Sequence, residues 1–335
     1  MAAIFLYPKI DKIIGSPNPY IFNFQKSLAE NHRVVNANAP NRGILSFFIH
    51  FNNAELFILN WPETIPEKKF GGVQKRLFSL FLWMAKKFSK RIVWVLHNKG
   101  SHHKGENEVT RDMFNRLMRS SDFIITHSNA GKDFIAVDYP DALSKVHVIP
   151  HPFTQKLRNY QADEKKYDFL IWGSIFPYKG IDIFLNYLQT SPALNKARVL
   201  IIGRCSDQDY KSKILSILPE SADYKDELLS LEEIANYSNQ SRFTLFTYKS
   251  QTVISSGSLV DSIRMGAIVL GPDHGAFKDM GNLAFMRTFK DFDDIPKIIE
   301  GFDPADERIE ADRNTFMKQN SWHNFVQKIE KITGI

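Results

Sequence analysis

The chain has 335 residues, of which 43% are hydrophobic and 24% charged, so it is long and apolar enough for two domains with packed cores. Its single cysteine, Cys205, excludes an internal disulfide and a cysteine-based metal site and is typical of a reducing compartment, so we expect a cytoplasmic protein. The net charge of +6 suits anionic ligands or an anionic membrane surface, but it is too small to indicate a nucleic-acid-binding protein. No stretch approaches the apolar length of a membrane span, and the opening MAAIFLYP indicates a first strand rather than a signal peptide.

The first half of the chain alternates between short apolar runs and helical patterns. The apolar runs predict strands at Ala3–Tyr7, Arg33–Asn36, Ala54–Asn60, Arg91–Leu96, Phe123–Thr126 and Val146–Ile149. Apolar residues at helical spacing predict helices at Tyr20–Ala29, Val73–Phe88 and Glu106–Met118. Strands and helices that alternate in this way are typical of parallel βαβ units, so we expect a doubly wound sheet.

A second series of strands and helices follows a polar segment, residues 153–166, which marks a domain boundary. Its predicted strands are 169–172, 198–202, 243–246 and 267–270, and its predicted helices are 180–188, 208–217, 231–238 and 257–265. The predicted fold is therefore α/β, with two Rossmann-like parallel-sheet domains, 1–152 and 153–310, that face a cleft. A helical tail, 311–335, is expected to pack back toward the first domain.

The stretch DFLIWGSIFPYKGIDIFLNYL, residues 168–188, is the clearest strand–loop–helix unit in the chain. Phe169–Trp172 forms its buried strand, and Lys179 stands at the entrance of its helix. Ligands of open α/β sheets bind at the carboxyl ends of strands, where a helix N-terminus offers free N–H groups. We therefore expect an anion there, most simply a phosphate; the alternative is a solvated lysine in an ordinary loop.

Three segments carry a resemblance to a known family: FLIWGSIFPYKGIDIFL, then ARVLIIGR, then SSGSLVDSIRMGAIVLGPDHG. They resemble the GT-B nucleotide-sugar glycosyltransferases, the superfamily that includes bacterial capsule, lipopolysaccharide, mannosyl and glucuronosyl transferases. The resemblance follows the element order of the whole chain. It implies transfer of a hexosyl group from a UDP- or GDP-sugar co-substrate to a hydroxyl of a glycan or polyprenyl-linked saccharide, in bacterial surface polysaccharide biosynthesis. Enzymes of this type need no cofactor and no bound metal.

The resemblance assigns the donor to the second domain. The family's phosphate loop, roughly Gly-Arg-Leu-x-x-x-Lys-Gly, corresponds to residues 173–180, with Lys179 as the diphosphate-binding lysine and Ser174 in place of the arginine. Arg204 is a candidate for the missing cation, with a surface role as the alternative. A run of serines and a glycine resembles a second phosphate cradle, for which plain helix capping is the alternative, and Asp261 matches a ribose-binding acid. The implied donor-binding residues are Gly173, Ser174, Tyr178, Lys179, Arg204, Ser255, Ser256, Gly257, Ser258 and Asp261.

The resemblance assigns the acceptor and the proton transfer to the first domain. His97 ends a strand at which similar transferases have a histidine near the reacting centre. An inverting transfer needs a general base, and His97, Glu106 and Asp11 all stay open as candidates. The implied catalytic residues are His97, Glu106 and Lys179, and the implied acceptor-binding residues are Asn18, Tyr20 and Asn98.

Two departures from the family pattern keep other interpretations open. Ser174 replaces the loop arginine, and the family's first glutamate falls at Val253, so retention and inversion of the sugar configuration both stay open. A catalytically inactive GT-B scaffold or partner subunit and a nucleotide-sugar epimerase are therefore alternatives. The adjacent His102 and His103 cannot both face one ion on regular structure, so no metal site is expected.

The segment 72–91 combines apolar residues with several lysines and arginines. Phe78, Leu82, Trp83 and Phe88 are its large apolar residues. This composition fits a basic amphipathic helix that lies on the inner face of the cell membrane, and it also fits a packing helix with basic ends.

Overall fold

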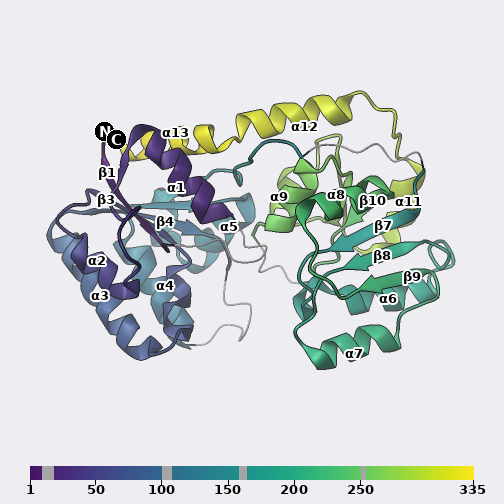
Figure 1. Cartoon of the computed structure of the whole chain (residues 1–335), viewed down its shortest axis with the longest axis horizontal. Coiled ribbons are helices and arrows are strands. Elements are labelled where there is room, and N and C mark those ends of the chain that lie inside the picture. The colour runs from purple at the N-terminus through teal and green to yellow at the C-terminus, as the bar shows by residue number, and fades with distance from the viewer. Residues whose placement is uncertain (10–18, 100–107, 158–163, 250–253) are drawn as a thin grey trace. The chain divides into compact units, whose positions relative to one another are not determined.

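The computed structural model describes residues 1–9, 19–99, 108–157, 164–249 and 254–335 and divides them into two compact units. Unit 1 comprises the described residues of Met1–Pro152 and Asn320–Ile335, together with Ile254 and Ser255. Unit 2 comprises the described residues of Phe153–Gln251 and Ser256–Gln319. Each unit holds a six-stranded parallel sheet with helices against it (Figure 1). The predicted α/β class with two doubly wound sheets is therefore confirmed.

The sheet of unit 1 has the strand order β2-β1-β3-β4-β5-β6. Its strands are β1 (Ala3–Tyr7), β2 (Arg33–Val34), β3 (Leu56–Asn60), β4 (Arg91–Leu96), β5 (Phe123–Thr126) and β6 (Val146–Val148). Its helices are α1 (Tyr20–Asn31), α2 (Ser46–Ile49), α3 (Gly71–Lys87), α4 (Glu108–Ser120), α5 (Asn129–Asp138) and α13 (Trp322–Thr333), and its 3-10 turns are η1 (Gly43–Leu45), η2 (Pro62–Glu67) and η3 (Pro140–Lys145). Alternate residues of β3 enter two separate cores, Phe57 on one sheet face and Ile58 on the other, because both faces are covered by helices.

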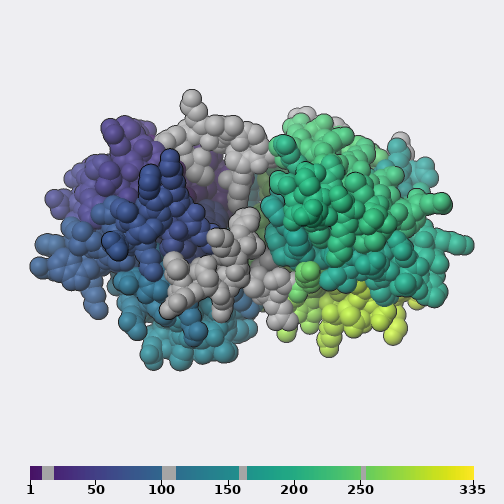
Figure 2. Space-filling view, turned by 90° about the horizontal axis from the view of Figure 1, so that it is seen from below, coloured from purple at the N-terminus to yellow at the C-terminus, as the bar shows by residue number. Residues whose placement is uncertain are grey.

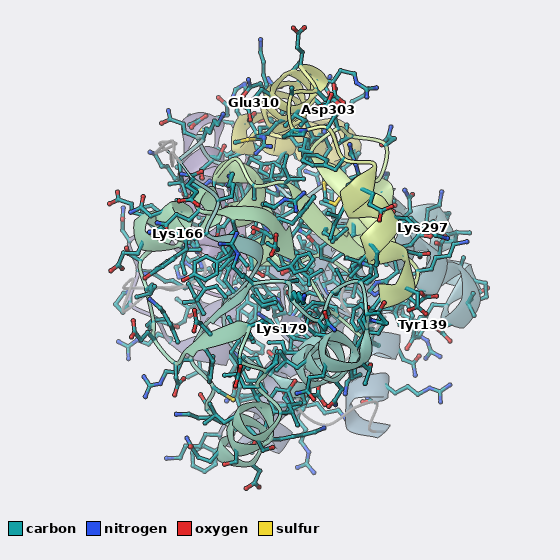
Figure 3. All side chains as sticks on the ribbon, turned by 90° about the vertical axis from the view of Figure 1, so that its right-hand side faces the viewer. Tyr139, Lys166, Lys179, Lys297, Asp303 and Glu310 are labelled. Atoms are coloured by element: carbon teal, nitrogen blue, oxygen red, sulfur yellow. The ribbon has the colours of Figure 1, made fainter. Side chains whose placement is uncertain are left out.

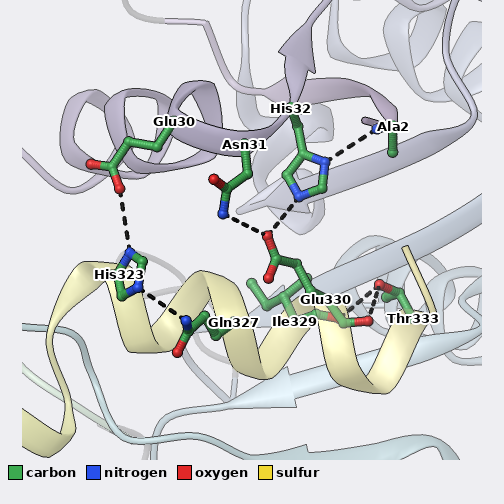
Figure 4. Close-up of polar contacts among 9 residues, drawn as sticks. All are labelled: Ala2, Glu30, Asn31, His32, His323, Gln327, Ile329, Glu330 and Thr333. Carbon is green, nitrogen blue, oxygen red and sulfur yellow. Dashed lines mark hydrogen bonds and ion pairs between the residues drawn. The ribbon is translucent and has the colours of Figure 1, made fainter.

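Helix α13 closes unit 1 by packing on α1, and the two ends of the chain lie close together (Figures 1 and 4). The Glu330 carboxylate accepts hydrogen bonds from Asn31 Nδ2 at 3.2 Å and from His32 Nε2 at 2.8 Å. His32 Nδ1 accepts from the backbone N–H of Ala2, so the proton of the ring lies on Nε2, where it can be donated to Glu330. This last helix is therefore part of unit 1, although it lies at the far end of the chain.

The sheet of unit 2 has the strand order β12-β11-β10-β7-β8-β9. Its strands are β7 (Tyr167–Trp172), β8 (Val199–Ile202), β9 (Ala222–Lys225), β10 (Ser241–Leu245), β11 (Val269–Pro272) and β12 (Met286–Phe289). Its helices are α6 (Ile181–Thr190), α7 (Gln208–Ser216), α8 (Leu231–Asn239), α9 (Gly257–Arg264), α10 (Gly275–Asp279), α11 (Ile295–Glu300) and α12 (Arg308–Gln319), and its 3-10 turns are η4 (Pro177–Lys179) and η5 (Phe292–Asp294). Strands β8 and β10 flank β7, so the residues that follow these three strands meet at one edge of the sheet.

The sequence pattern does not predict several short elements, among them β9, β12, α2 and α5. Strand β9 has the sequence ADYK and lies at the edge of its sheet, where only one of its four residues is buried. Helix α5 buries only Gly131 and Ile135, too few apolar residues for a clear periodic face. None of the described helices combines the length and the apolar character that crossing a membrane requires.

Candidate functional site

Lys179 lies at the carboxyl end of β7 and folds back over the strand. Its ammonium donates to the carbonyl oxygen of Trp172 at 3.3 Å, and the residue is only 5% exposed. Figure 3 shows Lys179 toward the middle of unit 2, whereas Lys166 and Lys297 lie toward its edge. Burial lowers the Lys179 pKa to about 8, and within the described part of the chain no acidic side chain forms an ion pair with it. A buried ammonium without a counter-charge is unfavourable until an anion approaches it.

Two glycines allow the backbone to surround this lysine. Gly173 has φ +91°, and a Cβ there would stand 3.3 Å from Lys179 Nζ and 3.7 Å from Ser258 Cβ. Gly180 has φ +67°, and a Cβ there would stand 2.6 Å from the carbonyl oxygen of Thr247, which is closer than real contacts allow. Thr247 Oγ1 in turn donates to the Lys179 carbonyl at 2.6 Å. The loop therefore needs glycine at both positions, for its backbone conformation and for space.

The start of α9 lies beside the lysine. Ser256 stands at the N-cap position, but its side chain makes no capping hydrogen bond. Its Oγ instead lies 2.8 Å from Ser258 Oγ and 3.0 Å from the hydroxyl of Tyr248, which is also 3.3 Å from Ser258 Oγ. The first N–H groups of α9 are thus left without a side-chain cap, in the arrangement that binds anions. The alternative interpretation of these serines was helix capping, and Ser256 does not cap the helix.

Tyr248 connects Lys179 with the start of α9, and the sequence pattern did not single it out. It is 6% exposed, and Lys179 Nζ lies 5.9 Å from the centre of its ring. It follows β10, which pairs directly with β7. In the sequence, Tyr248 is marked only by its place just after an apolar run. The order of the strands in the sheet is what puts that run next to Lys179.

The other residues predicted to bind the donor are less buried than Lys179. The Ser174 and Arg204 side chains are exposed, and the Arg204 carbonyl accepts a hydrogen bond from the Ile175 N–H at 3.0 Å, which ties the loops after β7 and β8 together. The Tyr178 ring is half-buried, with its centre 5.8 Å from that of Tyr248. Gly257 is exposed at the first turn of α9, and Ser255 is assigned to unit 1. Their donor-binding roles stay predictions.

Asp261, the predicted ribose-binding acid, already has a partner within α9. It forms an ion pair with Arg264 at 2.5 Å, and the two side chains are 18% and 12% exposed. Burial raises the Asp261 pKa, although Arg264 acts in the opposite direction. The Arg264 Nε also donates to the Gln155 carbonyl at 3.1 Å. Asp261 is therefore held in a fixed position and retains one carboxylate oxygen beyond its contact with the arginine.

At the carboxyl edge of the unit 1 sheet, three histidines surround Tyr20. The ring centres of His97, His127 and His151 lie 5.0, 5.7 and 5.1 Å from that of Tyr20. Trp61 stacks on His97 with its ring centre at 4.1 Å. Tyr20 is only 2% exposed, so the residue predicted to touch the acceptor supports the histidines from within. His127 and His151, each following a strand, were not singled out in the sequence.

For two of the three rings, hydrogen bonds indicate which nitrogen carries the proton. Asn60 Nδ2 donates to the Tyr7 carbonyl at 3.0 Å, so its Oδ1 accepts from His97 Nε2 at 3.1 Å and leaves a lone pair on His97 Nδ1. His127 Nδ1 donates to the Ile149 carbonyl at 2.9 Å, so its Nε2 accepts from the Tyr20 hydroxyl at 3.1 Å.

All three rings of the cluster are neutral near pH 7. Burial lowers the pKa of His97 well below its ordinary value, with a smaller effect from His127 and His151. Burial likewise lowers the pKa of His127 to about 4 and that of His151 to about 3. The cluster thus offers uncharged hydrogen-bonding groups.

Within the described residues, no three His, Cys, Asp or Glu side chains form a group suited to a metal ion.

The remaining predicted residues are Asn98, which the structure describes, and a set that lies outside the described part of the chain. Asn98, predicted to bind the acceptor, directly follows His97 and is half-buried. The predictions that lie outside the described residues are Asp11, Asn18, His102, His103, Glu106 and Val253.

Comparison with solved structures places the whole chain in one fold group. HepE from Anabaena, solved with UDP and glucose, has a TM-score of 0.68 and 13% identity, with 100% of both chains covered. AviGT4, a glycosyltransferase involved in avilamycin A biosynthesis, has a TM-score of 0.60 and 14% identity over 99% of this chain and 96% of its own. A glycosyltransferase from Rickettsia africae has a TM-score of 0.59 and 14% identity over 98% and 97%. No family model and no curated protein matches the sequence. The likeness shows that the chain has the GT-B fold.

Proposed function

We propose that this protein is a glycosyltransferase that takes a sugar from a nucleotide diphosphate sugar bound to unit 2. The observation that carries the proposal is the buried Lys179 ammonium, which has no acidic partner in the described part of unit 2 and lies next to the uncapped start of α9. A diphosphate supplies the missing negative charge. Because HepE and another neighbour, an α-glucosyltransferase, were solved with UDP, a UDP-sugar is the first donor to test.

In this proposal, the unit 2 edge receives the charge of the leaving group. As the glycosidic bond to the nucleotide breaks, negative charge grows on the diphosphate oxygens, which Lys179 and the first amides of α9 stabilise. Gly173 allows the phosphate to approach the backbone, and Ser258 donates a further hydrogen bond. Asp261 holds the ribose with its remaining oxygen. The Lys179 ammonium and the dipole of α9 stabilise the leaving-group charge that a metal ion stabilises in other transferases.

The acceptor hydroxyl is proposed to bind at the carboxyl edge of the unit 1 sheet. The unprotonated His97 Nδ1 accepts a hydrogen bond from a sugar hydroxyl there. Because burial holds the pKa of this ring well below its ordinary value, it is a weak base, which leaves Glu106 and Asp11 as the other candidates for proton removal. A glycan or lipid-linked saccharide acceptor, a role in surface polysaccharide biosynthesis and a cytoplasmic location at the membrane complete the proposal.

Calorimetric titration with UDP, UDP-glucose and GDP tests the donor site. Lys179→Met should weaken nucleotide binding by more than about tenfold, since it removes a full charge from the diphosphate. Lys166→Met, which removes an exposed lysine of the same unit, should leave binding unchanged. Equal affinity of the Lys179 variant and the unmodified protein would remove the assignment.

A second assay separates transfer from the two alternatives. Release of free nucleoside diphosphate only when a glycan acceptor is added supports a transferase. Conversion of the bound sugar without acceptor would indicate an epimerase, and failure to bind any nucleotide would indicate an inactive scaffold.

A further inference from the structure

Helix α3 is apolar on both of its sides. Its inner side contributes Phe78 and Leu82 to the core of unit 1, so these two residues, which the sequence pattern had grouped with a membrane-facing surface, point the other way. On the outer side, Val73, Leu80 and Trp83 are 58%, 46% and 58% exposed. A packing helix is expected to be polar on its solvent side, so this outer apolar stripe needs another explanation.

The stripe is part of a larger exposed apolar surface. Residues 45–88 contain seven of the thirteen large hydrophobic side chains that are exposed in the described chain. Helix α2 packs beside α3, with the Phe47 and Phe81 ring centres 4.5 Å apart. Figure 1 shows α2 and α3 next to each other, and Figure 2 shows the blue segment that contains them on the surface of unit 1. Besides the three residues of the stripe, the exposed residues are Leu45, Ile49, Phe70 and Phe88.

The segment that carries the stripe is basic. Residues 68–91 contain eight lysines and arginines and no acidic residue. Of these cations only Lys75 forms an ion pair with a described acid, Asp112. Arg76 is exposed between two apolar positions of the stripe, and Lys87 Nζ lies over the Trp83 ring at 5.0 Å. The apolar stripe is thus mixed with unpaired positive charge.

We infer that the outer face of α3, defined by Val73, Arg76, Leu80, Trp83 and Lys87, docks on an anionic lipid surface. The apolar side chains enter the boundary between headgroups and acyl chains, while Arg76 and Lys87 bind lipid phosphates. Two copies of the chain would bring like charges together if they paired through this face, which argues against self-association. The inference does not rest on glycosyl transfer, although it would bring a lipid-linked acceptor within reach.

Co-sedimentation with vesicles tests the inference on the full chain. The protein should sediment with vesicles of equal parts phosphatidylglycerol and phosphatidylcholine, but not with phosphatidylcholine alone, and added salt should release it. The double variant Leu80→Ser/Trp83→Ser should lose at least about tenfold in partition coefficient, because it removes two inserting side chains. Arg76→Gln and Lys87→Gln should each lose about fivefold.

Matched controls keep the test decisive. Val137→Ser/Leu215→Ser removes two exposed apolar side chains from other helices and should leave the partition coefficient unchanged. Unchanged melting temperature and UDP affinity of each variant show that folding and the donor site are intact. No binding to anionic vesicles, or equal loss in the control variant, overturns the inference. Dimers seen by light scattering that Leu80→Ser/Trp83→Ser dissolves would instead assign this face to protein contact.

Discussion

The ammonium of Lys179 lies 3.3 Å from the carbonyl oxygen of Trp172, the last residue of β7. One hydrogen bond to a carbonyl compensates poorly for removing a full charge from water. The shift of the Lys179 pKa from 10.5 to about 8 corresponds to a destabilisation on the order of 3 kcal/mol at pH 7. In the free protein this buried charge is unfavourable, and a bound anion would compensate for it. Such an arrangement is typical of binding sites.

Lys179→Met should therefore stabilise the free protein while it weakens nucleotide binding. We expect the free energy of unfolding to rise by about 1–3 kcal/mol, because methionine fills the same space without a buried charge. Urea unfolding with and without UDP measures both effects. The unmodified protein should gain stability from UDP and the variant should not. A destabilised variant in the absence of nucleotide would show that the lysine has a structural partner.

Nucleotide affinity should fall as the pH rises above 8. The free protein loses the Lys179 proton near that pH, whereas the terminal phosphate of UDP, with a second pKa of about 6, is almost completely ionised by pH 8. Above pH 8, the Kd for UDP should rise by up to tenfold for each pH unit. Calorimetry at pH 7, 8 and 9 tests this, and Lys179→Met should show a flat profile. A flat profile for the unmodified protein would contradict the assignment.

Tyr248→Phe should loosen the start of α9. The variant removes the hydroxyl that lies 3.0 and 3.3 Å from the two serine hydroxyls, and we expect a loss of about 1 kcal/mol in unfolding free energy. The Kd for UDP should rise several-fold, because the serines and the uncapped amides lose their fixed position. Tyr237→Phe, which removes a hydroxyl bonded to Lys225 elsewhere in unit 2, is the matched control. Equal nucleotide affinity in both variants would argue against a positioning role.

Acid should destabilise unit 1 through its histidine cluster. His127 and His151 stay neutral in the folded state down to about pH 4 and 3, whereas both accept a proton near pH 6.5 when unfolded. The unfolded state therefore binds more protons below pH 6.5, and stability falls by about 1.4 kcal/mol per pH unit for each histidine. Urea unfolding between pH 7.5 and 5 measures this slope. His151→Gln should reduce this slope, because it removes one of the two rings that stay neutral in the folded state.

The order of elements and the loop that carries Lys179 follow from local sequence. Strand β7 is predicted by its apolar run, and the loop after it by Gly173, Pro177 and Gly180, because these residues control the backbone angles directly. A lysine at the entrance of a helix is likewise a local feature. Such signals depend only on neighbours along the chain, so they can be interpreted without knowing the fold.

Strand order and burial decide the rest, and both depend on residues far apart in sequence. Only the pairing of β10 with β7 brings Tyr248 to Lys179, and only the assembly of the first sheet brings His127 and His151 around Tyr20. The two apolar sides of α3 look alike in sequence, yet one packs in the core and the other faces solvent. Hydrophobic pattern determines that a side chain prefers an apolar environment; the tertiary structure decides which neighbours provide it.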